Sequence, residues 1–296
     1  MKRIFFIGLT VLLFVTNACD SGKQLAQTKQ TAQTAYNNGD YAKALEVWEG
    51  MINTSKHKGS EKQCIVLTNA GMAAQKLGQT DKAIDYLKKA TYSDFSNEDT
   101  YFTLAEIYAE KDNLSLELEN LEIYETRFPH GKNIENVNKR LFELYVEIEN
   151  WEKALNIWEK LTPEQKLETQ QIESYLTVND KLGNEEKSKE LALQLLKHDE
   201  DNIPALNWLA NYYFWKAEKR YNKEMKIYEQ KKTRKQYAHL LKVIDEVAVE
   251  FNVALKYGKR LYKLDPTSAN AKLLGNTYSR LNYKDKAEYY QDLGRK

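Results

Sequence analysis

A small residue recurs along this chain at intervals close to 34 residues, and no other feature of the sequence restricts the fold as strongly. The recurring positions are Ala44, Ala83, Glu117, Ala154, Ser188, Ala254 and Ala287, at successive intervals of 39, 34, 37, 34, 66 and 33 residues. Glu117 and Ser188 depart from alanine, so the repeats around them are less regular. A period of this length predicts an array of similar units, each packed only against its neighbours.

The clearest unit is residues 67–90, which predicts two helices joined by a turn at Gly78. The apolar face of the first helix recurs at helical spacing and consists of Leu67, Ala70, Ala74 and Leu77. The second helix has a corresponding face made of Ala83, Leu87 and Ala90. Small residues on both faces, including Gly71, indicate that the two helices cross closely.

This unit resembles the tetratricopeptide repeat, whose first helix ends in leucine-glycine followed by tyrosine and whose second helix holds an alanine and a large apolar residue. Those places are taken here by Ala70-Gly71, Ala83 and Leu87, and the tyrosine is replaced by Ala74. The resemblance implies an all-α fold, a right-handed solenoid of about seven helix-turn-helix repeats.

The sixth interval is almost twice the period, and two uninterrupted helical patterns fill it. The first begins at Pro204, and the second ends before Pro266. We interpret residues 205–264 as one repeat whose two helices are lengthened into a hairpin; a standard repeat followed by a degenerate one is the alternative. At 1.5 Å per residue, a helix of roughly 27 residues would be about 40 Å long, enough to project beyond the solenoid.

The N-terminus predicts export. Lys2-Arg3 precede a mostly apolar run from Ile4 to Val15, which is too short to span a membrane. A basic start followed by a short apolar run is typical of a secretory signal peptide. We assign the signal peptide to residues 1–18.

The motif that follows the apolar run is Thr16-Asn17-Ala18-Cys19. It resembles the lipobox of bacterial lipoproteins, whose cysteine is lipidated and becomes the mature N-terminus. Thr16 departs from the aliphatic residue usual at its place, so cleavage before Cys19 without a lipid is the alternative. If Cys19 carries the lipid, residues 19–23 form a lipid-anchored tether, and residues 24–296 form the repeat array.

Catalytic and metal-binding patterns are absent from the sequence. The four histidines, His57, His130, His198 and His239, show no metal-ligand spacing. The chain has neither a glycine-rich phosphate loop nor a nucleophile elbow. Cys64 is the one cysteine left beyond Cys19, and we expect a half-buried, unreactive thiol. We therefore expect no catalytic residue, no metal and no cofactor, in a chain that is not an enzyme.

By resemblance, the first helices of the repeats line a concave groove that binds a partner. The groove residues implied are Lys29, Gln33, Tyr36, Asn69, Met72, Asp99, Phe102, Glu106, Glu110, Lys139, Glu143, Glu147, Asn207, Asn211, Phe214 and Trp215. The middle of this groove contains the carboxylates of Asp99, Glu106, Glu110, Glu143 and Glu147. They predict a partner segment rich in lysine or arginine, or a cation site; a merely solvated face is the alternative.

The expected end of the hairpin is basic. Residues 216–235 hold nine lysines and arginines against three glutamates. The residues that we assign to a basic hairpin tip are Lys223, Lys226, Lys231, Lys232, Arg234 and Lys235. Such a tip predicts contact with anionic lipid headgroups or an acidic partner, and a solvated hairpin kept soluble by its lysines is the alternative.

These features predict a non-catalytic protein–protein interaction scaffold that binds another protein or peptide in its groove. The lipid on Cys19 would anchor it in the cell envelope, as an outer-membrane lipoprotein that faces the periplasm. An accessory subunit of an envelope assembly or uptake complex is a second hypothesis. A hydrolase of envelope polymers, which needs a carboxylate pair in a pocket, is a third. No nucleic-acid partner is expected, because the formal charge of the whole chain is only +1.

Overall fold

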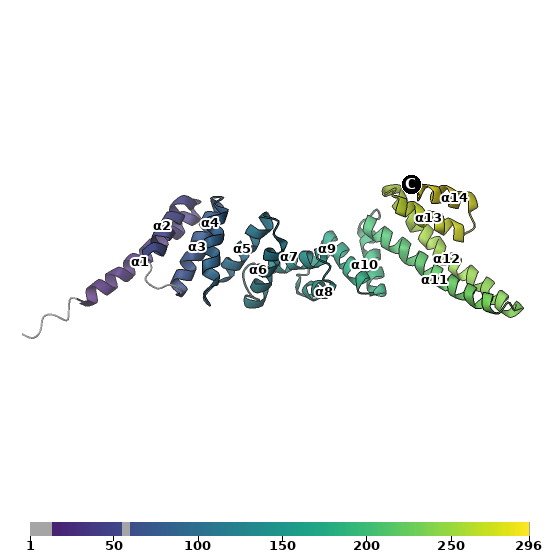
Figure 1. Ribbon diagram of the computed structural model, residues 1–296, viewed down its shortest axis with the longest axis horizontal. Coiled ribbons are helices and arrows are strands. Elements are labelled where there is room, and N and C mark those ends of the chain that lie inside the picture. Colours follow the sequence, from purple (N-terminus) through teal and green to yellow (C-terminus); the bar gives the residue numbers. More distant parts are fainter. Residues whose placement is uncertain (1–13, 55–59, 296) are drawn as a thin grey trace, which may run out of the picture. The chain divides into compact units, whose positions relative to one another are not determined.

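The computed structural model describes residues 14–54 and 60–295, and its regular elements there are all helical (Figure 1). The α-helices are α1 Phe14–Asn37, α2 Tyr41–Thr54, α3 Glu61–Lys76, α4 Thr80–Thr91, α5 Glu98–Glu110, α6 Leu114–Arg127, α7 Ile134–Glu147, α8 Trp151–Lys160, α9 Thr169–Lys181, α10 Glu185–His198, α11 Ile203–Gln230, α12 Arg234–Leu264, α13 Ser268–Arg280 and α14 Lys284–Leu293. A short 3-10 helix, Gln165–Leu167, precedes α9. Six successive helix pairs pack within one unit each, and α7 and α8 follow in the same order along the chain, which confirms the predicted all-α repeat fold.

The chain divides into two compact units, residues 1–144 and 145–296, with the boundary inside α7. The first unit contains α1 to α6 and most of α7, and the second contains the remaining helices. The core of the first unit lies between the paired helices, where alanines alternate with large residues such as Trp48 and Leu87.

Most of the predicted signal peptide, residues 1–13, lies outside the described residues. The backbone of α1 begins at Phe14 and passes through residues 19–23, so the predicted tether is helical in this structure. No helix in the described part of the chain is long and apolar enough to span a membrane. Cleavage and lipidation at Cys19 stay predictions.

All seven recurring small positions lie on the second helix of a pair and are buried. They are at most 5% exposed, Glu117 and Ser188 included. The Ser188 hydroxyl donates to the Asn184 carbonyl at 3.1 Å, so its polar atom is satisfied within α10. Steric restriction where two helices cross explains why the sequence repeats a small residue there.

Two residues of the second repeat differ from their predicted environment. Leu77, assigned to the apolar face, caps the end of α3 and is 36% exposed. Cys64, expected to be half-buried, is only 2% exposed, and its thiol donates to the Ala90 carbonyl at 3.4 Å. Burial raises the pKa of this thiol.

Six of the helix pairs share one type of turn. A residue with φ between 51° and 80° follows the first helix: Gly39, Gly78, Asp112, Glu149, Gly183 and Asn282. The next N–H then donates to a carbonyl five residues back, as Asn150 does to Tyr145 at 2.8 Å. This left-handed turn satisfies a free carbonyl at the helix end, and glycine adopts it without strain.

The pair α11–α12 is different. Its helices have 28 and 31 residues and are joined through Lys231 and Thr233 without a left-handed residue. Asn202 caps α11 by accepting from the Ala205 N–H at 3.0 Å, and Pro204 occupies the first turn, where its missing N–H costs nothing. The structure thus has one lengthened repeat, as predicted, and the alternative with an additional degenerate repeat is wrong.

The two long helices contact each other as far as Tyr228 and Tyr237, but their buried core, which includes Leu273 of α13, lies near one end. Residues of α11 are buried as far as Ala217, and burial on α12 begins at Leu240. Residues 218–239, which we call the hairpin tip, include no buried residue. Figure 1 shows both helices running past α13 and α14.

Candidate functional site

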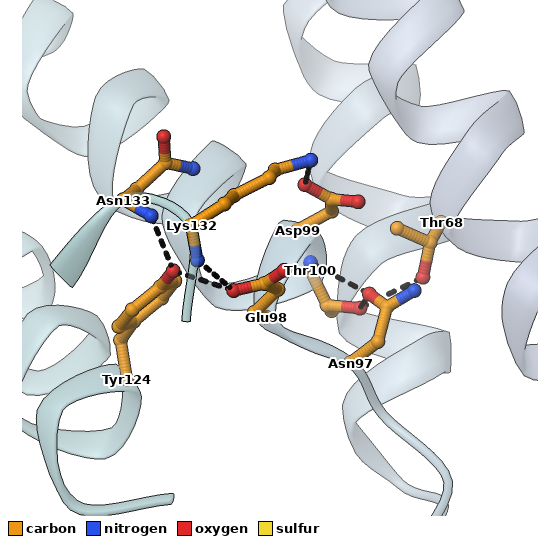
Figure 2. A network of polar contacts seen from close by, with 8 residues as sticks. All are labelled: Thr68, Asn97, Glu98, Asp99, Thr100, Tyr124, Lys132 and Asn133. Atoms are coloured by element: carbon orange, nitrogen blue, oxygen red, sulfur yellow. Dashed lines mark hydrogen bonds and ion pairs between the residues drawn. The ribbon is translucent and has the colours of Figure 1, made fainter. Parts of the chain in front are cut away.

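A polar network in the first unit holds the start of α5 against the segment before α7 (Figure 2). Glu98 accepts hydrogen bonds from the Tyr124 hydroxyl at 2.7 Å and from the Lys132 N–H at 2.8 Å. Burial and the bond to Glu98 raise the pKa of Tyr124 to about 12. The Lys132 ammonium lies 2.5 Å from Asp99, so a predicted groove carboxylate already has a cationic partner within the chain.

The same network joins α3 to α5. The hydroxyls of Thr68 and Thr100 share a buried hydrogen bond of 2.7 Å, and Asn97 caps α5 by accepting from the Thr100 N–H at 3.1 Å. These contacts fix the position of the first turn of α5, which contains Asp99.

A second ion pair joins α6 to α7. Glu117, with a side chain only 5% exposed, accepts from Arg140 through both carboxylate oxygens, at 2.6 and 3.1 Å. Arg140 also lies 3.6 Å from Glu143. Glu117 and Arg140 line a cavity of about 210 Å³ together with Phe102. The charge that replaces alanine at Glu117 is therefore neutralised by the next repeat.

Tyr36 of α1 lies close enough to Asp99 and Glu106 of α5 to feel their charges. Burial is the main cause of the raised pKa of Tyr36, and the charges of Asp99 and Glu106 raise it further. Although Glu106 is exposed, partial desolvation by its surroundings raises the pKa of its carboxyl group, which Lys76 opposes. Asn69 and Met72 of α3 are half-buried.

Two of the five predicted groove carboxylates, Asp99 and Glu143, have cationic partners within the chain, and the predicted basic partner segment or cation site stays a prediction. Glu110 is exposed, and Glu147, also exposed, belongs to the second unit. The other predicted groove residues of the first unit are polar but engaged or half-buried: Gln33 donates to Asn37 at 3.0 Å, and Lys29 and Lys139 are half-buried.

In the second unit, three aromatic residues follow one face of α11 at helical spacing: Trp208, Tyr212 and Trp215. The rings of Trp208 and Tyr212 stack, with centroids 4.8 Å apart and an interplanar angle of 14°. The Trp208 indole N–H donates to Asp180 of α9 at 2.7 Å. Trp215 is 60% exposed, which is unusual for the largest apolar side chain.

These aromatic residues line a groove of about 540 Å³ that we call the aromatic groove. Its other lining residues are Asp180, Glu185, Asn207, Asn211, Lys216 and Lys219. The Asn211 amide donates to the Asn207 carbonyl at 2.9 Å, and Lys216 pairs with Glu250 at 2.9 Å. The polar side chains beside the aromatic rings, Asn211 and Lys216, are thus positioned by partners within the chain.

Of the predicted groove residues on α11, Asn207, Asn211 and Trp215 lie in the aromatic groove and Phe214 does not. Phe214 is 3% exposed and packs in the hairpin core, 5.7 Å from the Phe251 ring. Because successive residues of an α-helix point about 100° apart, Phe214 faces the hairpin core while Trp215 faces the groove. The prediction missed Trp208 and Tyr212, which the spacing of seven and three residues before Trp215 could have identified.

The acidic side chains of the hairpin tip are mostly engaged. Glu218 accepts from Arg280 at 2.6 Å, and Glu224 lies 3.2 Å from His239. Within the described part of the chain, the predicted basic tip residues make no ion pair: Lys223, Lys226, Lys231, Lys232, Arg234 and Lys235. The tip also exposes apolar side chains, Ile227, Tyr237 and, immediately after it, Leu241, which are 39%, 50% and 44% exposed.

The acidic loop between α10 and α11 has a structural partner. Arg260 of α12 donates to Asp201 at 2.7 Å and to Glu200 at 3.0 Å, which ties the loop to the hairpin. Over residues 14–54 and 60–295, no three histidine, cysteine, aspartate or glutamate side chains gather as a metal site.

Comparison with known proteins identifies the repeat. Residues 66–97 match the family model of the tetratricopeptide repeat. No curated protein matches the chain.

Several solved structures have similar folds. A proposed protein-binding protein from Bacteroides ovatus is 17% identical, over 74% of this chain and 98% of that one, with a TM-score of 0.52. A tetratricopeptide repeat protein from Parabacteroides merdae is 14% identical, over 91% and 97% of the two chains, with a TM-score of 0.45. YrrB, a tetratricopeptide repeat protein with an unusual peptide-binding site, is 15% identical, over 65% and 95%, with a TM-score of 0.48. At 17% identity, the likeness to the Bacteroides ovatus protein supports the fold alone.

Proposed function

We propose that this chain, whose residues 66–97 match the tetratricopeptide repeat, is a non-catalytic scaffold that binds a protein partner in the aromatic groove of α11. The observation that carries this proposal is the exposure of Trp215 beside the stacked pair Trp208–Tyr212. Covering the exposed part of a tryptophan yields about 2 to 4 kcal/mol of hydrophobic stabilisation. The exposed part of Trp215 contributes no hydrophobic stabilisation to the folded chain, and a partner that covers it would gain this stabilisation on binding.

The groove is also prepared for binding. Trp208 is fixed by its bond to Asp180 and its stack on Tyr212, so little side-chain entropy is lost when a partner covers it. Tryptophan and tyrosine are the residues most often found at binding hot spots, particularly in pockets shielded from water. The rigid aromatic faces supply the affinity in this proposal.

The partner element that fits is a short segment of a protein. The groove wall from Asn207 to Lys219 is about 18 Å long at 1.5 Å per residue. That length matches roughly five residues of extended chain. Amide and charged side chains of both signs border the groove, which suits hydrogen bonding to a peptide backbone.

We propose further that the scaffold is exported and anchored to the outer membrane, facing the periplasm, by a lipid on Cys19. The support is the basic and apolar start of the chain and the lipobox-like residues 16–19. Replacing Cys19 with alanine should move the protein from the membrane fraction to the soluble envelope fraction. Undiminished membrane association of that variant would contradict the anchor without affecting the binding proposal.

Site-specific photo-crosslinking tests the binding proposal in cells. A photoreactive residue at position 215 should yield a discrete adduct with one envelope protein. Position 249 is the matched control, since Val249 is 66% exposed on α12 and lies outside the aromatic groove. An adduct that forms equally from both positions, or that persists when Trp208 and Tyr212 are replaced with alanine, would contradict the proposal.

A further inference from the structure

Glu218 and Tyr221, at the base of the hairpin tip, contact Arg280 of α13, and Tyr221 packs against the hairpin core. The rest of the tip is held in place by contacts between its own two helices. No residue from 218 to 239 is buried, whereas the helix segments before and after it are. The rings of Tyr228 and Tyr237 lie 5.7 Å apart across the tip and join the two helices there. The composition of the tip is therefore little restricted by packing within the repeat array.

The tip carries a large uncompensated positive charge. Residues 218–239 include eight lysines and arginines and three glutamates. Glu218 is engaged by Arg280 outside the tip, and Glu224 lies beside His239, while Arg220 contacts Glu246. Glu229 is the one acidic residue close to the turn, and no ion pair joins it or another described carboxylate to the lysines and arginines there, so the tip keeps an excess of positive charge.

Exposed apolar side chains lie among these charges. Tyr237 and Leu241 are four residues apart, so they lie on one face of α12, and Arg234 precedes Tyr237 on that face. Ile227 is exposed near the end of α11. Tyr237 contacts Tyr228, but half of Tyr237 and much of Leu241 and Ile227 stay exposed, so apolar surface is available to a binding partner at the end of this charged hairpin.

We propose that the hairpin tip binds the surface of a lipid bilayer that contains anionic lipids. Basic residues are attracted to anionic headgroups, tyrosine favours the membrane interface, and leucine and isoleucine can enter the boundary of the acyl chains. The basic residues are spread over two helix ends and a turn instead of lining one groove, which fits a plane of many headgroups better than one acidic peptide. This contact is independent of the aromatic groove and of any lipid on Cys19.

Vesicle co-sedimentation tests this inference. Every protein would be the full chain with Cys19→Ala, so that no lipid anchor contributes. Vesicles of phosphatidylcholine alone would be compared with vesicles that contain phosphatidylglycerol as well. Binding should require phosphatidylglycerol and should weaken as sodium chloride rises from about 0.1 to 1 M, because the Debye length falls from about 10 to 3 Å.

Two sets of substitutions separate charge at the tip from charge in general. The tip variant carries Lys231→Gln, Lys232→Gln, Arg234→Gln and Lys235→Gln, and should bind at least about tenfold more weakly. The matched control replaces four exposed lysines elsewhere in the second unit, Lys197, Lys259, Lys272 and Lys284, with glutamine and should bind nearly as well as the parent. A third variant, Tyr237→Ser with Leu241→Ser, should weaken binding and leave the salt dependence in place.

Equal binding by the tip variant and the parent would overturn the inference. So would equal loss in the tip and control variants, which would show that only net charge matters. Failure of the parent to bind vesicles, with retention of an acidic protein through the tip, would instead assign the tip to a protein partner and would also overturn it. Thermal unfolding of each variant shows whether the fold is retained.

Discussion

The six shorter helix pairs and the long hairpin α11–α12 use their residues differently. In the shorter pairs, the polar groups most prominent in the sequence have structural roles: left-handed turns close the pairs, Glu117 is paired with Arg140, and Asp99 with Lys132. The hairpin has no left-handed turn, leaves Trp215 exposed, and ends in basic residues without partners. Contacts within the fold account for the first set of residues more fully than for the second, and for this reason both proposed binding surfaces lie in the hairpin.

The ion pair in the shorter repeats gives the largest expected effect. Arg140→Ala should lower the free energy of unfolding by about 3 kcal/mol, because Glu117 would remain buried without a cation. Glu117→Ala should cost less than about 1 kcal/mol, since it restores the usual alanine and leaves a half-exposed Arg140 near Glu143. Urea denaturation of both variants measures the difference, and equal losses would show that the cost does not come from leaving Glu117 buried without a cation.

Close helix crossing in a short repeat gives the next effect. A Cβ atom at Gly71 would lie 2.6 Å from Cγ of Leu87, which is fully buried. Gly71→Ala should therefore destabilise the protein by about 2 kcal/mol. Gly50→Ala is the control, because nothing lies within 4 Å of the added atom, and it should stabilise α2 by roughly 0.5 to 1 kcal/mol. A similar response at both positions would show that the crossing is looser than described.

The period of small residues was sufficient to predict the seven helix pairs, because a helix crossing restricts residue size whatever the rest of the repeat contains. It predicted even the pairs where glutamate or serine replaces alanine. The sequence could not show that Glu117 would meet Arg140, since that contact depends on how consecutive repeats pack. The sequence also could not show which of the neighbours Phe214 and Trp215 is buried. Which ring enters the core depends on the rotation of α11 about its axis, and in the structure Phe214 is buried and Trp215 is exposed.

The shared turn offers a smaller, stabilising change. Glu149 has φ = 58°, a conformation that is strained for a residue with a side chain. Glu149→Gly should raise the free energy of unfolding by about 1 kcal/mol, whereas Gly183→Ala, at φ = 75°, should lower it by a similar amount. Denaturation midpoints at constant m-value measure both. No gain from Glu149→Gly would mean that its side chain makes a compensating contribution.

The hairpin tip should contribute least to stability. The variant with glutamine at positions 231, 232, 234 and 235 should change the free energy of unfolding by less than about 0.5 kcal/mol, because these side chains are exposed and unpaired. Thermal unfolding at low and physiological salt measures this. A loss above 1 kcal/mol would show that the tip lysines have a structural role like the charges of the shorter repeats.

The central claim is that the aromatic groove of α11 binds the protein partner, and the affinity of Trp215→Ala tests it most directly. The partner is the protein captured by crosslinking at position 215, and isothermal titration calorimetry measures its affinity for the unmodified and substituted chains. We predict a loss of about 2 kcal/mol in binding, roughly thirtyfold in Kd, with the melting temperature unchanged. An unchanged Kd, or a loss of affinity that only accompanies unfolding, would contradict the account.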